Sequence, residues 1–176
     1  IGENMTLRRA ANVFVSNGAL ASYVHSAIAP GMGKIGVLVG LESNSDADKL
    51  AELGKQIAMH IAAAKPLSVS QDDLNQAEVE RERAVLSEQA RESGKPEEII
   101  EKMVIGRLRK FYEEVCLLDQ TFVIDGETKI SDVLANATKE LGAPVSVAGF
   151  ALMVLGEGIE KKEEDFAAEV AAAAGG

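Results

Sequence analysis

LASYVHSAIAPGMGKIGVLVGL, residues 20–41, is the stretch of sequence that decides the fold, because two runs of strand-forming residues flank a turn signal. The signal is Pro30-Gly31, and it predicts two antiparallel strands, Leu20–Ile28 and Ile35–Leu41. The segment Met5–Val15 comes just before them, ends in the strand-forming residues Val13-Phe14-Val15, and predicts a further strand of the same meander. This part of the chain therefore predicts a small antiparallel sheet.

The glycines of this stretch also match a nucleotide-binding motif. Gly31-Met32-Gly33-Lys34-Ile35-Gly36 has the G-x-G-x-x-G spacing of dinucleotide-binding loops. That motif binds a pyrophosphate only where a strand precedes it and a helix follows it. Here a predicted strand follows, so we interpret the glycines as part of a hairpin turn.

A helix is predicted after the meander. Asn44-Ser45-Asp46 supplies N-cap side chains, and the helical composition runs to Lys65, where Pro66 ends it. The helix is apolar nearly all round from Ile57 to Ala64, with Met59, Ala62 and Ala63 on the side away from its main apolar stripe. Such a helix is either fully buried or covered by a second protein, and the pattern leaves both alternatives open.

Two charged helices are predicted next. Ser70 with Asp73 has the spacing of a capping box and predicts a helix over 71–92. Ser93-Gly94-Lys95-Pro96 ends it, and a second helix is predicted over 97–114. The apolar positions of the second helix follow the narrow stripe of a coiled coil, which predicts a protruding helical hairpin.

The remaining segments complete an α+β fold. We expect a short extended piece at Thr121–Ile124, a helix at Ile130–Leu141, a further sheet strand at Val145–Leu155 and a last helix at Lys161–Ala174. The predicted domains are a core sheet and helix at 1–70, a helical-hairpin dimerisation arm at 71–118, the rest of the core at 119–160 and a C-terminal helical module at 161–176.

Composition excludes several classes of function. The 176 residues carry a formal net charge of -10 and show no cluster of basic residues, so direct binding of nucleic acid is not expected. The longest apolar stretch, Val147–Gly156, is about half of a membrane span, so we expect no membrane partner. The single cysteine, Cys116, allows no internal disulfide, which fits a reducing, cytoplasmic location.

The side chains of this sequence give little support for an enzymatic function. His25 and His60 are the only histidines, and their separation matches no known spacing of metal ligands. No nucleophile motif surrounds a serine or Cys116. We therefore expect no catalytic residue, no metal site and no cofactor, and we keep a small enzyme that uses His25 or His60 as a remote alternative.

Several short motifs are informative when they are taken together. They are Ile1-Gly2-Glu3-Asn4 with Arg8-Arg9, residues 56–63 (QIAMHIAA), Ser93-Gly94-Lys95-Pro96, Glu101-Lys102-Met103, Gly106-Arg107 and residues 156–161 (GEGIEK). They span essentially the whole chain, and in this order they resemble the motifs of the bacterial translation elongation factor Ts family.

This resemblance implies a guanine-nucleotide exchange factor for the GTPase elongation factor Tu. Such a factor binds the nucleotide domain of the GTPase, disturbs its Mg²⁺ and phosphate site, and so promotes release of GDP. Because the coupling is reciprocal, it binds the nucleotide-free GTPase more tightly than the GDP form. Covalent chemistry is not needed for this activity.

The arm at about 79–115 resembles the family's dimerisation coiled coil.

Partner-binding residues follow from the same resemblance. Ile1 and Gly2 match the family's Ile-Gly pair that touches the nucleotide domain, and His60 matches a histidine that presses near the phosphate loop. Phe166 and Val170 match the C-terminal module that packs on that domain. Met59 and Ala63 are added because the helical wheel places them on the outer side of the same helix as His60.

The sequence departs from the family at its front. It begins with Ile1 rather than Met and contains neither the family's N-terminal helical module nor its Thr-Asp-Phe-Val segment, so we expect the C-terminal part of a longer protein. On that basis we expect retained partner binding with weaker nucleotide exchange. The alternative from another class of function is a homodimerising coiled-coil scaffold without exchange activity.

Overall fold

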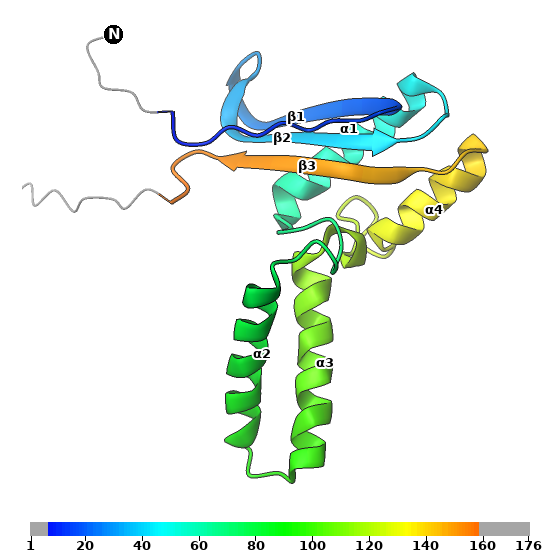
Figure 1. Ribbon diagram of the computed structural model, residues 1–176. Helices are drawn as coiled ribbons and strands as arrows, with labels where there is room; N and C mark the ends of the chain where they lie inside the picture. Colours follow the sequence, from blue (N-terminus) through cyan, green and yellow to red (C-terminus); the bar gives the residue numbers. More distant parts are fainter. Residues whose placement is uncertain (1–6, 159–176) are drawn as a thin grey trace, which may run out of the picture.

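The computed structural model describes residues 7–158 of the chain (Figure 1). A three-stranded sheet forms one layer, helices lie on one of its sides, and a pair of helices projects away from them. The elements described, in chain order, are β1 (Gly18–Ala29), β2 (Met32–Glu42), α1 (Ala47–Ala64), α2 (Gln76–Arg91), α3 (Glu97–Val115), the 3₁₀ turn η1 (Leu117–Asp119), α4 (Ile130–Leu141) and β3 (Ser146–Val154).

The sheet has the order β1-β2-β3, and both strand pairs are antiparallel. The turn predicted at Pro30-Gly31 is confirmed: Gly31 has φ 73°, a left-handed conformation that glycine adopts without a steric penalty. Because the turn is this short, β1 and β2 extend closer to it than their predicted ends. The hairpin interpretation of the G-x-G-x-x-G string is also confirmed, since β2 begins at Met32, inside the motif.

The strand predicted at Met5–Val15 is wrong for the residues that the structure describes. Residues 7–15 are not in a strand, and the sheet order β1-β2-β3 does not include them. The segment lies instead over the outer face of the sheet. A Cβ built on Gly40 of β2 would be 2.7 Å from Val15 Cγ1 and 3.0 Å from Val13 Cγ1. Val13 and Val15 therefore pack on a face of the sheet and do not pair at its edge.

Helix α1 matches its prediction at both ends. The Asp46 carboxylate caps the first turn by accepting hydrogen bonds from the backbone N–H groups of Asp48 and Lys49. At the other end, Lys65 is left-handed with φ 50°, and its N–H donates to the Ile61 carbonyl. One side of α1 packs on β1 and β2 and is buried along Leu50, Gly54, Ile57, Ala58 and Ile61.

The helical hairpin is present, but its first helix starts later than predicted. Ser70 donates to Asp73 through both its N–H and its hydroxyl, as a capping box suggests, yet this contact closes a turn before the helix. Helix α2 begins at Gln76, where the Asn75 side chain accepts from the N–H of Ala77. Helix α3 begins at Glu97 as predicted, and the two helices pack through small apolar clusters.

Helix α4, strand β3 and the segment 121–124 complete the core. Helix α4 and strand β3 lie within a residue of their predicted bounds, and Ile130 and Leu134 of α4 are buried in the same core as α1. The piece predicted to be extended at Thr121–Ile124 is mostly a turn, with a single bridge from Thr121 to Lys129. The last helix predicted, Lys161–Ala174, lies outside the described residues.

Candidate protein-interaction surface

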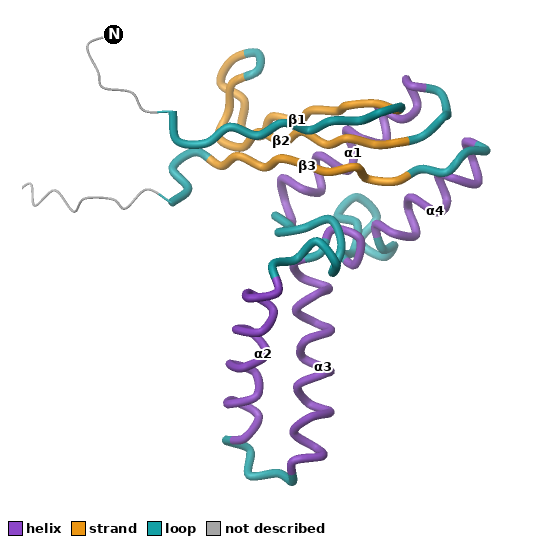
Figure 2. Tube along the Cα trace, viewed as in Figure 1, coloured by secondary structure: helices purple, strands orange, loops and turns teal. Residues whose placement is uncertain are grey.

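An apolar hollow opens where α1, the sheet and the loop after η1 meet. We call it the Met59 hollow; its volume is about 350 Å³. The loops that join α1 to α2 and α3 to α4 gather between the sheet layer and the hairpin (Figure 2), and the second of them supplies Val123 and Ile124 to the hollow. Its lining residues come from β1, β2, α1 and the loop 120–124, and they are Tyr23, His25, Ile35, Met59, Ala62, Ala63, Val123 and Ile124.

The hollow keeps large apolar side chains in contact with solvent. Met59 is 38% exposed, Val123 is 48% and Ile124 is 50% exposed, and Ala63 beside them is also exposed. Single exposed apolar residues are ordinary, but a contiguous group of them is characteristic of an interaction site. A methionine there adds a flexible side chain that adapts to a partner's shape.

One polar pair lines the same hollow. The Tyr23 hydroxyl and His25 Nδ1 are 3.0 Å apart and share a hydrogen bond, which orients the imidazole. His25 is exposed, so this histidine is available to a partner. It was not among the residues predicted to bind a partner, because nothing in its local sequence pattern shows that β1 places it beside α1.

His60 lies on the same helix but inside the protein. Its side chain is 0% exposed, and it is covered by the loop 120–124. The Val123 N–H donates to His60 Nδ1 over 3.2 Å, so the ring hydrogen is on Nε2, which donates to Gln120 Oε1 over 2.9 Å. Burial lowers the pKa of His60, and the hydrogen bond to Gln120 opposes that shift in part. The buried ring is therefore neutral, with both nitrogens bonded.

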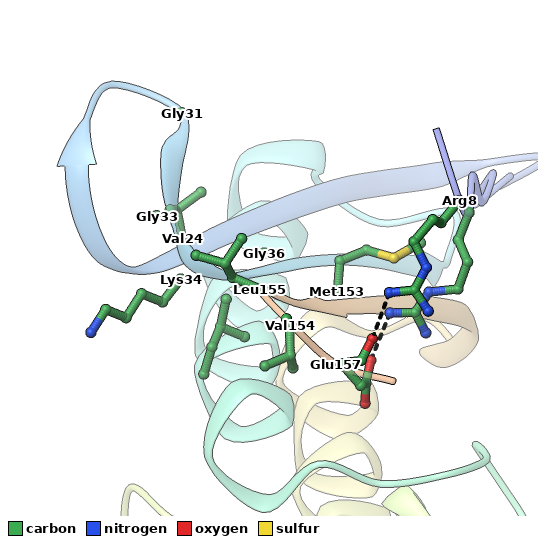
Figure 3. A pocket seen from close by; sticks show the side chains of 13 residues that line it. Arg8, Val24, Gly31, Gly33, Lys34, Gly36, Met153, Val154, Leu155 and Glu157 are labelled. Carbon is green, nitrogen blue, oxygen red and sulfur yellow. Dashed lines mark hydrogen bonds and ion pairs between the residues drawn. The ribbon is translucent and has the colours of Figure 1, made fainter. Parts of the chain in front are cut away.

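A second hollow, of about 410 Å³, lies at the end of the sheet where β3 finishes (Figure 3). The Arg8 guanidinium donates to the carbonyl oxygens of Glu157 and Gly158, each over 3.0 Å. Arg9 forms an ion pair with the Glu157 carboxylate at 2.8 Å. Both arginines are thus engaged within the chain, and they join the segment 7–15 to the turn after β3.

The hairpin carries a third group of exposed apolar side chains. Ile105 is 68% exposed, and Ile99 and Val85 are each 44% exposed. A shallow groove of about 330 Å³ runs between α2 and α3 beside Ile105, and its walls include Arg83, Arg91, Glu97 and Glu101. The side chains that pack the two helices together, such as Ala90, Ile100 and Val104, are buried between them.

The structure brings together only some of the residues predicted to bind a partner. Met59 and Ala63 lie in the Met59 hollow, and His60 lies beneath it. Ile1, Gly2, Phe166 and Val170 lie outside the described residues. Tyr23, Val123 and Ile124 were not predicted. For Val123 and Ile124 the sequence offers one weak signal, an apolar pair before the Asp125-Gly126 turn. The signal is weak because the exposure of the pair depends on how the loop packs.

The described residues also bear on metal binding, membrane crossing and thiol chemistry. Within residues 7–158 no group of three or more His, Cys, Asp or Glu side chains is placed to hold a metal ion. None of the helices in this range is long and apolar enough to cross a membrane. Cys116 is buried, and burial raises the pKa of its thiol, so it is a poor nucleophile at neutral pH.

The three-stranded antiparallel sheet, the helices on one side of it and the projecting helical hairpin define a small α+β protein. The chain is a member of the elongation factor Ts family, whose model matches residues 1–157. It is 64% identical to elongation factor Ts of Paramagnetospirillum magneticum over 99% of this chain, and 61% identical to that of Rhodospirillum centenum over 99%. Elongation factor Ts of Caulobacter vibrioides is 57% identical over 99% of this chain. The chain spans 56–57% of the length of these relatives.

Proposed function

We propose that this chain is part of a guanine-nucleotide exchange factor that promotes release of GDP from the translation GTPase elongation factor Tu. Membership of a translation elongation factor family supports the proposal, and so does the Met59 hollow, which is the observation that carries it. The factor binds the nucleotide domain of the GTPase and disturbs its Mg²⁺ and phosphate site. It works in the cytoplasm, where translation takes place.

The proposed mechanism is a difference between two binding free energies. If the chain binds the nucleotide-free GTPase more tightly than the GDP-bound form, then binding of the chain lowers the affinity of the GTPase for GDP by the same factor. Such coupling typically amounts to about 1–3 kcal/mol, a 5- to 150-fold change in affinity. Surfaces that bind are sufficient for this, so we propose no covalent step and no enzyme activity.

The Met59 hollow supplies the binding energy in this proposal. Its exposed apolar side chains lose contact with water when a partner side chain enters, which contributes roughly 25 cal/mol per Å² of apolar surface buried. The Tyr23–His25 pair adds a polar group at the edge, where it fixes the partner's orientation. The surface is therefore suited to an apolar side chain flanked by a hydrogen-bonding group.

The test is nucleotide release measured with a fluorescent GDP analogue bound to elongation factor Tu. The chain is expected to accelerate release, and Met59→Asp is expected to reduce the acceleration at least tenfold, because it places a charge in the hollow. Val85→Asp is the matched control: Val85 is 44% exposed on α2, close to the 38% of Met59, but lies outside the hollow. Equal effects of the two substitutions would contradict the proposed site.

A second role, self-association through the hairpin, is favoured by a separate observation. Ile99 and Ile105 are exposed on α3, and burying them against another copy extends the narrow apolar stripe into a coiled coil. We propose that the chain forms a homodimer through this arm. Sedimentation velocity tests the proposal: Ile105→Asp is expected to give monomers while leaving nucleotide release unchanged.

A further inference from the structure

We propose that His60 is a positioning residue of the partner-binding surface: it holds the loop 120–124 so that Val123 and Ile124 complete the Met59 hollow. The inference rests on the proposed function, because it assigns a role within the surface that binds the GTPase. It also gives His60 a different part from direct contact with a partner, since its side chain is 0% exposed.

Both hydrogen bonds that tie the loop to α1, among the residues described, end on the His60 ring. The Val123 N–H donates to Nδ1 over 3.2 Å, and Nε2 pairs with Gln120 Oε1 over 2.9 Å. The Phe122 ring, which is 5% exposed, packs near the imidazole with the two ring centres 5.9 Å apart. The loop therefore contacts the His60 side chain at three residues, Gln120, Phe122 and Val123.

The loop's own hydrogen bonds do not replace this attachment. Phe122 N–H donates to the Thr128 carbonyl over 2.7 Å, and Gly126 N–H donates to the Phe122 carbonyl over 2.8 Å. These bonds shape the turn 122–128 from within, and they do not determine its distance from α1. Without an acceptor on His60, the Val123 N–H must turn toward water, and Val123 and Ile124 then move away from Met59.

The same network reaches the base of the hairpin. Gln120 Nε2 donates to the Glu114 carbonyl over 2.6 Å. Glu114 is in the last turn of α3, where carbonyl groups lack a partner within the helix. His60 and Gln120 thus join α1, the loop and the end of the hairpin, and no buried polar side-chain atom in residues 7–158 is left without a hydrogen bond.

Three substitutions separate positioning from contact. His60→Asn keeps an acceptor near the position of Nδ1, so it retains the bond from the Val123 N–H. His60→Gln places its amide nearer to Gln120 and loses that acceptor. His60→Leu removes both bonds while filling a similar volume.

The experiment measures affinity for nucleotide-free elongation factor Tu together with hydrogen exchange at the Val123 amide. We expect His60→Leu and His60→Gln to accelerate that exchange and to weaken binding about tenfold, the loss that corresponds to one unmade buried hydrogen bond. His60→Asn is expected to protect the amide and to bind within about threefold of the unchanged chain. Circular dichroism and thermal midpoints establish that each variant is folded.

Several outcomes would overturn the inference. The inference is overturned if His60→Leu binds as tightly as the unchanged chain while its Val123 amide exchanges freely. It is also overturned if His60→Asn binds as weakly as His60→Leu while that amide stays protected. Should His60→Leu fail to fold, Ile124→Ser provides the second measurement. Its half-exposed side chain leaves the core intact, and unchanged binding by this variant equally overturns the inference.

Failure of the proposed function is distinguishable from failure of this inference. If the unchanged chain does not bind the GTPase, or if Met59→Asp binds normally, the proposed surface itself is wrong. If Met59→Asp weakens binding and the His60 variants do not, the surface stands and only the positioning role is lost.

Discussion

Gly40 of β2 allows the segment 7–15 to pack on the outer face of the sheet, and its replacement is a sharp test of that packing. In Gly40→Ala the new Cβ would lie 2.7 Å from Val15 Cγ1 and 3.0 Å from Val13 Cγ1. Valine side chains are short and stiff, so the clash is relieved only by moving the segment away from the sheet. Gly149, its partner on β3, is the matched control, because nothing lies within 4 Å of a Cβ built there.

The magnitude follows from two opposing terms. Replacing a glycine in a strand by alanine gains roughly 0.5–1 kcal/mol of stability, because the unfolded chain loses conformational freedom. Overpacking costs about 1–3 kcal/mol and applies only at Gly40. We therefore expect Gly40→Ala to lower the free energy of unfolding by about 1–2 kcal/mol, whereas Gly149→Ala raises it by up to about 1 kcal/mol.

Urea unfolding followed by circular dichroism measures both free energies. A double variant, Gly40→Ala with Val15→Ala, is expected to recover part of the loss, because the smaller side chain makes room for the new methyl group. If Gly40→Ala is as stable as Gly149→Ala, the segment 7–15 does not pack on this face, and the reasoning is refuted.

Three further predictions follow from single contacts. Burial lowers the pKa of His60, so the unfolded chain binds more protons than the folded one just below about pH 6.5. The free energy of unfolding therefore falls as the pH drops through that range. Urea titrations at several pH values should show a smaller fall in His60→Asn. Asp46→Ala removes the cap of α1 and should cost about 0.5–2 kcal/mol in the same assay, with Asp48→Ala losing less. Arg9→Glu should lower the free energy of unfolding by up to about 1 kcal/mol, because the Arg9–Glu157 pair is half-exposed. Adding Glu157→Arg should restore that loss. No recovery in this double-mutant cycle would show that the pair contributes nothing to stability.

Features that depend on neighbours in the chain were predicted well. The Pro30-Gly31 turn, the cap at Asp46 and the start of α3 after Pro96 are local choices of backbone conformation. Each is decided by the residues within a few positions, so the sequence pattern carries the information. The family resemblance has the same origin, since it rests on short motifs in a fixed order.

The candidate site could be predicted only in part. Helical periodicity placed Met59 and Ala63 on the outer side of α1, where the structure leaves both exposed. The family resemblance placed His60 against the partner, but the structure covers its side chain completely. The reason is the loop 120–124, which is about 60 positions away in the chain and whose packing no periodicity describes.

The sequence by itself determined the main elements, the hairpin pairing and the family, because caps, turns and hydrophobic periodicity act over a few residues. Only the tertiary structure decided that residues 7–15 lie on a face of the sheet, that His25 is exposed beside α1, and that His60 is enclosed. These outcomes depend on which distant segments compete for the same apolar surface and the same buried hydrogen-bonding groups. That competition is settled only when the whole chain packs.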